Sequence, residues 1–147
     1  MPTRQVDISK KDLIYREATA TGRIKLSSGT VSLVRKNQLE KGDPIAIAGT
    51  MAIMGAKLTP LIVALCHQLS IEKVEPKVSV GLDWIDVTVT VGAHAKTGVE
   101  MEALTAVSAA LLNIWDVVKT HEKDPAGQYP STRIESLRVV RKVKRRS

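Results

Sequence analysis

The stretch KTGVEMEALTAVSAALLNIWDVVK, residues 96–119, decides the expected fold because it contains a long helical pattern. Side chains suited to a buried face recur in it at spacings of three and four, at Leu104, Val107, Ser108, Leu111, Trp115 and Val118. This period predicts an amphipathic helix whose broad apolar face packs on a sheet. Thr97 with Glu100 three residues later matches a capping box, so we expect the helix to begin at Gly98.

The opposite face of this predicted helix consists mostly of Ala, Thr and Ser, with a single acid near each end. At about 100° per residue, Glu102, Ala109, Asn113 and Asp116 fall close to one line along the helix. Small side chains allow close approach, so we expect either a second protein chain or a ligand to lie against this face. Glu102 and Asp116 lie about 21 Å apart along the helix axis, because a helix rises 1.5 Å per residue. One small substrate cannot touch both from a single chain.

Length and composition favour one soluble domain. The 147 residues can bury a substantial core, with residues 1–19 expected as an N-terminal arm and residues 143–147 as a basic tail. No apolar run reaches the ~18–20 residues needed to span a membrane, and the N-terminus lacks the apolar segment of a signal peptide. A single cysteine excludes an intramolecular disulfide framework. We therefore predict a cytoplasmic protein without a membrane partner.

The formal net charge of +7 predicts an anionic partner, either a nucleic acid or a phosphorylated small molecule. The chain has no Phe and only two Trp and two Tyr, which argues against aromatic platforms for single-stranded nucleic acid. The basic residues near the C-terminus, between Arg138 and Arg146, could bind nucleic acid or could simply protect an exposed edge strand with charge. Because the aromatic residues are so few, we predict no nucleic-acid partner.

The other elements follow from alternation and breakers. Strands are expected over residues 18–27, in two segments within residues 71–95 joined by a turn at 81–83, and over residues 133–144. Thr30 should cap a short helix through Gln38, and Asp43-Pro44 should begin a second helix that runs to about Lys57. The order strand, helix pair, strand, strand, helix, strand predicts a ferredoxin-like α+β fold, with helices packed on one face of an antiparallel sheet.

Several motifs resemble the cyclic pyranopterin monophosphate synthases of molybdenum cofactor biosynthesis. They are KTGVEMEALTA and WDVVK in the long helix, Leu65-Cys66-His67-Gln68-Leu69, Lys41-Gly42-Asp43, Ala56-Lys57, Arg16-Glu17-Ala18, and a C-terminal pattern from Ile134 to Lys142. Three departures are visible. Trp115 replaces the family's Tyr, Gln68 replaces its Pro, and KVKRRS replaces its glycine-rich tail.

The resemblance implies a fold of this kind and an enzyme that converts a cyclised GTP derivative into cyclic pyranopterin monophosphate and pyrophosphate. It implies catalytic roles for Asp116, Lys119 and Lys41. It implies substrate contacts for Arg16, Lys57, Leu65, Cys66, His67, Glu100, Met101, Glu102 and Lys142. No protein-bound metal or other cofactor is implied, although the triphosphate could bring Mg²⁺ with it. The resemblance also implies a hexamer, built as a trimer of dimers, with sites between subunits.

Several candidates also have an ordinary interpretation. Asp116 and Lys119 are three residues apart and could form a helix-surface ion pair, although Asp116 beside small residues favours a partly buried working acid. Glu100 is equally well explained as the capping-box partner, and His67 as a hydrogen-bonded loop histidine. The lysines could be surface residues, or could lower one another's pKa when held together. Arg16 could belong to a solvent-exposed arm.

Two other functions would explain part of the sequence. A basic ferredoxin-like module could bind nucleic acid without catalysis, but it would need exposed aromatic residues on its sheet. A purely structural oligomer would explain the small helix face but not the ordered Lys, His and acidic motifs. For an enzyme, the spacing of Glu102 and Asp116 predicts an oligomer with shared sites. The spacing does not say which motifs pair across the interface; we expect Lys41 and Asp116 of one site to come from different subunits.

Overall fold

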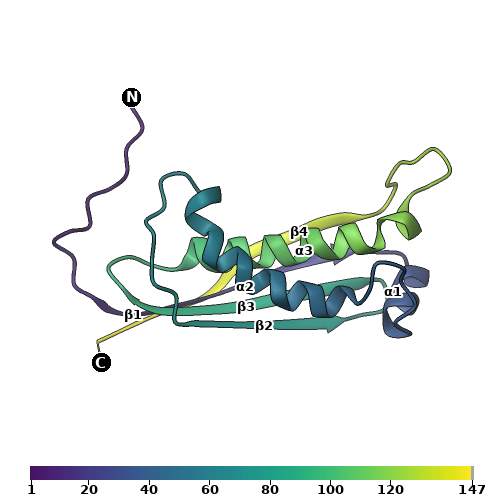
Figure 1. Cartoon of the computed structure of the whole chain (residues 1–147), viewed down its shortest axis with the longest axis horizontal. Helices are drawn as coiled ribbons and strands as arrows, with labels where there is room; N and C mark the ends of the chain where they lie inside the picture. The colour runs from purple at the N-terminus through teal and green to yellow at the C-terminus, as the bar shows by residue number, and fades with distance from the viewer. Residues whose placement is uncertain (147) are drawn as a thin grey trace.

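The computed structural model describes residues 1–146 as a four-stranded antiparallel sheet with helices on one face (Figure 1). The elements in chain order are β1 (Ile14–Lys25), α1 (Ser28–Arg35), α2 (Pro44–Ile62), β2 (Lys73–Val80), β3 (Trp84–Ala95), α3 (Glu100–Glu122) and β4 (Arg133–Arg145). The strand order in the sheet is β2-β3-β1-β4, and every neighbouring pair is antiparallel. The predicted α+β class, element order and placement of the helices are confirmed.

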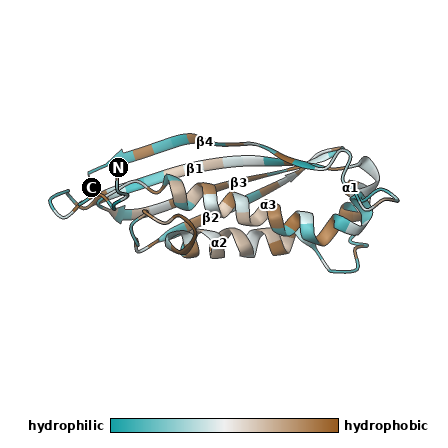
Figure 2. Ribbon diagram, turned by 90° about the horizontal axis from the view of Figure 1, so that it is seen from above, coloured by the Kyte–Doolittle hydropathy of each residue, from teal (hydrophilic) through white to brown (hydrophobic). Residues whose placement is uncertain are grey.

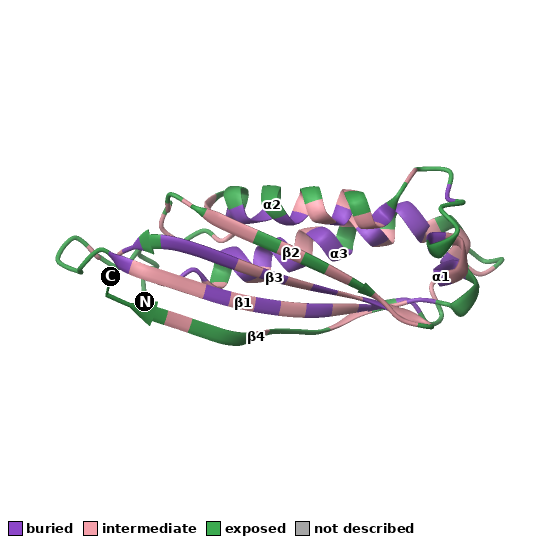
Figure 3. Cartoon of the chain, turned by 90° about the horizontal axis from the view of Figure 1, so that it is seen from below, coloured by how far each residue is buried: buried purple, intermediate pink, exposed green. Residues whose placement is uncertain are grey.

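The alternation of β3 separates the two faces of the sheet, as its sequence predicts. Its residues Ile85, Val87, Val89 and Val91 are fully buried beneath the helices, whereas the residues between them are partly exposed. Strand β1 pairs with β3 over its whole length and adds Ala18, Ala20 and Ile24 to the same buried layer. Figure 2 shows both long helices on one side of the sheet, and Figure 3 shows alternating buried positions along the two central strands.

The small-residue face of α3 packs against α2 of the same chain, which corrects the expectation that a second chain or a ligand occupies it. A Cβ added at Gly55 would lie 2.9 Å from the Cβ of Ala109 and 2.9 Å from the carbonyl oxygen of Thr105. Ala106 and Ala110 are completely buried. The sequence signal for close approach was therefore correct, but the approaching backbone belongs to the preceding helix.

Several predicted boundaries were wrong. Strand β1 begins at Ile14, so residues 14–19 belong to the sheet rather than to an arm, and β4 continues to Arg145 into the expected tail. Ser27 caps α1 in place of Thr30, because its hydroxyl accepts from the Thr30 amide, and α1 ends at Arg35. Asp43 does cap α2 with Pro44 in the first turn, but that helix continues through Pro60 to Ile62.

Two helices, Pro44–Ile62 and Glu100–Glu122, are long and apolar enough to cross a membrane by length and composition alone. Both lie on the sheet, and the apolar side chains of α3 that include Val107, Leu111 and Ile114 are completely buried in the core. Packing within the domain thus accounts for much of the apolar character of α3, whereas α2 leaves apolar side chains such as Leu61 and Ile62 exposed. The cytoplasmic location remains a prediction.

Candidate functional site

The first group of predicted site residues meets at the C-terminal half of α3. The Lys41 ammonium lies 2.9 Å from Oδ2 of Asp116, and the Lys119 ammonium lies 3.0 Å from Oδ1 of the same carboxylate. Lys41 reaches this position from the loop between α1 and α2, which Gly42 closes with a φ of 114° that favours glycine. We call Lys41, Asp116 and Lys119 the lysine–aspartate cluster.

The electrostatics of this cluster differ from the expectation. The Asp116 side chain is 55% exposed, so it is not a partly buried acid. Hydrogen bonds from Lys41 and then Lys119 lower the pKa of Asp116, and the hydrogen bond to Asp116 raises the pKa of Lys119. The aspartate is therefore a stable anion and Lys119 a stable cation at neutral pH, so the pKa of Lys119 shifts in the direction opposite to the expected lowering.

The second group meets near the N-terminus of α3, around a cavity of about 310 Å³. Five predicted substrate-binding residues are among those that line it: Leu65, Cys66, His67, Glu100 and Met101. The segment after α2 supplies the first three and the start of α3 supplies the other two. We call this space the Cys66 cavity.

Glu102 lies behind this cavity and is almost completely buried, with 1% of its surface exposed. The Cys66 thiol donates to its Oε2 over 3.6 Å, while its Oε1 has no hydrogen-bond partner among residues 1–146. Burial is the main reason that the pKa of Glu102 is raised, and burial followed by the nearby Glu102 raises the pKa of Cys66 to about 11. The pair therefore consists of a carboxyl biased toward its neutral form and a thiol that stays protonated.

Glu100 does not complete a capping box, which corrects the predicted start of α3. The helix begins at Glu100, its N-cap residue is Val99, and no side chain caps it. Glu100 instead accepts the Lys142 ammonium from β4 at 2.7 Å, so the structure brings Lys142 to the edge of the Cys66 cavity.

The remaining two candidates lie outside both groups. Arg16 points from β1 to the loop before α3 and donates to the carbonyl oxygens of Ala95 and Lys96 at 3.1 and 3.5 Å. Lys57 is exposed on α2, and no ion pair involves it within residues 1–146.

The two groups occupy different ends of the same helix. Asp116 follows Glu102 by 14 positions, about 21 Å along α3, as the sequence implied. Lys41 and Asp116 are in contact within one chain, so the expectation that they come from different subunits is wrong. Each chain therefore presents two separate partial sites.

Glu122 and His121, at the end of α3, make contacts that no periodic pattern in the sequence predicted. Glu122 is buried at the end of α3 and accepts from the Ser27 amide, the Ser27 and Thr30 hydroxyls, and the Thr132 hydroxyl at 2.7 Å. His121 lies 3.0 Å from Glu40, the residue before Lys41. These contacts hold the start of α1, the Lys41 loop and β4 against α3. The participating residues are far apart in sequence, so no local pattern could have revealed them.

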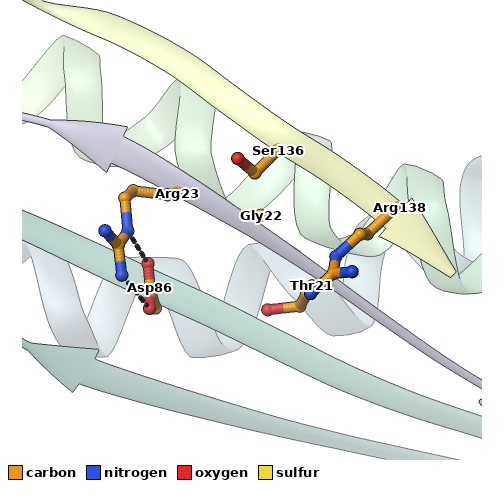
Figure 4. A pocket seen from close by; sticks show the side chains of 6 residues that line it. All are labelled: Thr21, Gly22, Arg23, Asp86, Ser136 and Arg138. Carbon is orange, nitrogen blue, oxygen red and sulfur yellow. Dashed lines mark hydrogen bonds and ion pairs between the residues drawn. The ribbon is translucent and has the colours of Figure 1, made fainter. Parts of the chain in front are cut away.

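A further cavity opens on the other face of the sheet and contains none of the predicted site residues (Figure 4). Arg23 there donates to both oxygens of Asp86, at 2.7 and 3.0 Å, and stacks 4.2 Å over the Trp84 ring. The charges of Arg23 and Asp86 are thus paired with each other, whereas Arg138, which also lines this cavity, makes no ion pair within residues 1–146.

Comparison with known proteins identifies the family of this chain. The sequence profile of the MoaC family matches residues 5–144. The chain belongs to the MoaC family. A protein of Sulfurisphaera tokodaii named probable cyclic pyranopterin monophosphate synthase is 50% identical over 139 residues, which cover 95% of this chain and 92% of that protein.

Two further relatives in the MoaC family bear the same name. The protein of Pyrococcus horikoshii is 50% identical over 141 residues, covering 96% of this chain and 89% of its own length. The protein of Methanococcoides burtonii is 50% identical over 139 residues, which cover 95% of this chain and 87% of that protein. These names do not support the alternative of a nucleic-acid-binding module.

Proposed function

We propose that this member of the MoaC family is a cyclic pyranopterin monophosphate synthase, a lyase of molybdenum cofactor biosynthesis. The near full-length identity of 50% to relatives of that name carries the proposal. Its substrate is then (8S)-3′,8-cyclo-7,8-dihydroguanosine 5′-triphosphate. The purine-derived part rearranges to a pyranopterin, a cyclic phosphate forms and pyrophosphate leaves.

The lysine–aspartate cluster suits the phosphate part of this reaction. Lys41 and Lys119 place two cations around Asp116, and phosphate oxygens accept charge-assisted hydrogen bonds from such groups. Asp116 is ionised there, so it can accept a proton or hold the two lysines in position. We assign catalytic roles to these three residues.

The Cys66 cavity suits the purine-derived part. It is lined by the apolar Leu65 and Met101 together with the polar His67, and cavities of mixed lining bind and orient small heterocycles. Glu102 behind it retains a proton more readily than an exposed glutamate, so its neutral carboxyl can donate a hydrogen bond. We assign substrate contacts to these residues and to Arg16, Cys66, Glu100, Lys57 and Lys142.

A complete site requires both partial sites within reach of one substrate. Because they lie about 21 Å apart along α3, we propose that the lysine–aspartate cluster of one subunit meets the Cys66 cavity of another. A two-fold axis relating two chains would generate two such sites at once. We propose a homo-oligomer of this kind, as a hexamer built from three dimers. We propose no protein-bound metal, and any Mg²⁺ would arrive with the triphosphate.

The direct test is a reaction of the purified protein with the cyclised GTP derivative. The expected products are pyrophosphate and cyclic pyranopterin monophosphate in equal amounts. A protein that is folded and oligomeric but releases no pyrophosphate from this substrate would show that the proposal is wrong.

A further inference from the structure

Lys41 is one of two residues at the tip of a tight turn between α1 and α2. The turn lies at the end of the molecule where α3 also ends (Figure 1). The Gly42 amide donates to the Leu39 carbonyl at 3.2 Å, which leaves Glu40 and Lys41 as the two central residues. Leu39 is buried in the core, whereas both central residues are exposed. We call residues 39–42 the Lys41 turn.

Both central residues of the Lys41 turn contact α3. The Lys41 ammonium lies 2.9 Å from Oδ2 of Asp116, and Oε2 of Glu40 lies 3.0 Å from Nε2 of His121. The hydrogen bond with His121 is the main reason that the pKa of Glu40 is lowered, so Glu40 is an anion at neutral pH and Nε2 of His121 is the donor. His121 follows Asp116 by five positions, about 7.5 Å along the helix. The turn is therefore attached to α3 at two separate points.

These two attachments differ in their relation to the substrate. The Lys41 and Asp116 side chains are 47% and 55% exposed, and an exposed ion pair of this kind contributes little to stability. A phosphate oxygen that binds the Lys41 ammonium competes with Asp116 for the same donors. The contact between Glu40 and His121 involves no group that we assign to substrate binding. It is therefore the attachment that a bound phosphate leaves in place.

The end of α3 that carries His121 is itself held in the fold. Glu122, the next residue, is buried and accepts hydrogen bonds from Ser27 and, at 2.7 Å, from the Thr132 hydroxyl. The His121 carbonyl accepts from the Thr30 hydroxyl at 3.5 Å. The His121 side chain is only 27% exposed, against 70% for Glu40. His121 is thus a fixed point against which a more exposed side chain can be held.

We propose that Glu40 and His121 are positioning residues for Lys41. Their hydrogen bond holds the tip of the Lys41 turn against α3, so that the Lys41 ammonium keeps its orientation when it exchanges Asp116 for a phosphate oxygen of the substrate. This role rests on the proposed function, in which Lys41 is catalytic. Neither Glu40 nor His121 was among the site residues that the sequence suggested.

The test compares kcat and KM for pyrophosphate release in the wild type, Glu40→Ala, Glu40→Gln and His121→Ala. Glu40→Ala and His121→Ala should each lower kcat about tenfold with KM within about twofold of the wild type, because Lys41 keeps its charge but loses its orientation. Glu40→Gln should remain close to the wild type, because its carbonyl oxygen still accepts from His121. The control Glu75→Ala removes an exposed carboxylate on β2 and should have no effect.

The double variant Glu40→Ala/His121→Ala should be no slower than either single variant, because both changes remove the same contact. All rates are measured well below the melting temperature of each variant, so a loss of stability alone leaves kcat unchanged.

Three results would overturn the positioning role while an active wild type leaves the proposed function standing. They are a wild-type kcat in Glu40→Ala, a Glu40→Gln variant as slow as Glu40→Ala, and multiplicative losses in the double variant. The second result would mean that the charge of Glu40 matters rather than its contact with His121. Absence of turnover in the wild type itself would overturn both the positioning role and the proposed function.

Discussion

Replacing Glu102 by glutamine tests whether the buried carboxyl behind the Cys66 cavity keeps its proton at neutral pH. Only 1% of Glu102 is exposed, and its Oε1 has no partner among residues 1–146. Burial is the largest cause that raises its pKa above the ordinary value of 4.5, and the charge of Glu100 acts in the same direction. Glutamine has nearly the same shape but cannot ionise, so it removes the titration and retains the volume.

The sign of the effect follows from proton linkage. As the pH rises through 4.5, the unfolded chain loses the Glu102 proton, whereas the folded protein retains it until a higher pH. Between the two pKa values the folded state binds more protons, so the free energy of unfolding of the wild type falls by up to about 1.4 kcal/mol per pH unit. The contribution levels off above the folded pKa. Glu102→Gln lacks this slope and should become progressively more stable relative to the wild type.

The assay is urea denaturation at one fixed protein concentration, because the stability of an oligomer depends on concentration. Curves from pH 4.5 to about pH 8 would be compared for the wild type, Glu102→Gln and the exposed control Glu75→Gln. The stability difference between Glu102→Gln and the wild type should grow with pH, while that of the control should not. A difference that is constant with pH would refute the argument that burial shifts the titration of Glu102.

Measurements of melting temperature and turnover can test four other substitutions. Asp116→Asn and Lys119→Ala should each abolish pyrophosphate release at a nearly unchanged melting temperature, because both side chains are exposed. Full activity in either variant would mean that the replaced residue forms only an ordinary surface ion pair. Glu122→Ala should lower the free energy of unfolding by about 3 kcal/mol, because several donors lose a buried acceptor. Gly55→Val should cost roughly 1–3 kcal/mol, because its Cβ would lie 2.9 Å from α3 atoms, and a wild-type melting temperature would contradict the close contact of α2 with α3.

The elements with strong periodic or breaker signals were predicted well from the sequence. The alternation of Trp84 to Val91 identified both the strand and its buried face, and Asp43-Pro44 identified the start of α2. These signals are local, and each reflects a backbone geometry that only a few residue types satisfy. The order of elements then sufficed for the ferredoxin-like arrangement.

Features that depend on long-range contacts were predicted less well. Thr97 and Glu100 have the spacing of a capping box, but Glu100 instead pairs with Lys142 from β4. The small face of α3 indicated close approach without indicating which backbone approaches. Val6, Ile8 and Lys11, which line the Cys66 cavity, have no periodic pattern in the sequence, and the contact of Val6 with His67 spans 61 positions.

The sequence identified the residues of the two partial sites but not how these residues divide into two groups. The motifs suggested one site, whereas the structure divides them between the lysine–aspartate cluster and the Cys66 cavity at opposite ends of α3. A helix separates side chains in proportion to their spacing, so the distance between Glu102 and Asp116 could be calculated in advance. The partner of Asp116 could not, because Lys41 is 75 positions away and reaches it through a loop.

The central claim, that one active site combines these two groups from different subunits, is tested most directly by co-expressing two inactive chains. Asp116→Asn disables the lysine–aspartate cluster and His67→Ala disables the Cys66 cavity. Random pairing across a two-fold interface should restore about a quarter of wild-type activity, because half of the dimers are mixed and each mixed dimer has one intact site. Co-expression of Asp116→Asn with Lys41→Ala should restore none, because both changes affect the same group. The claim would be contradicted if mixed oligomers of Asp116→Asn and His67→Ala remained inactive. It would also be contradicted if the wild type were a monomer by light scattering and fully active in that state.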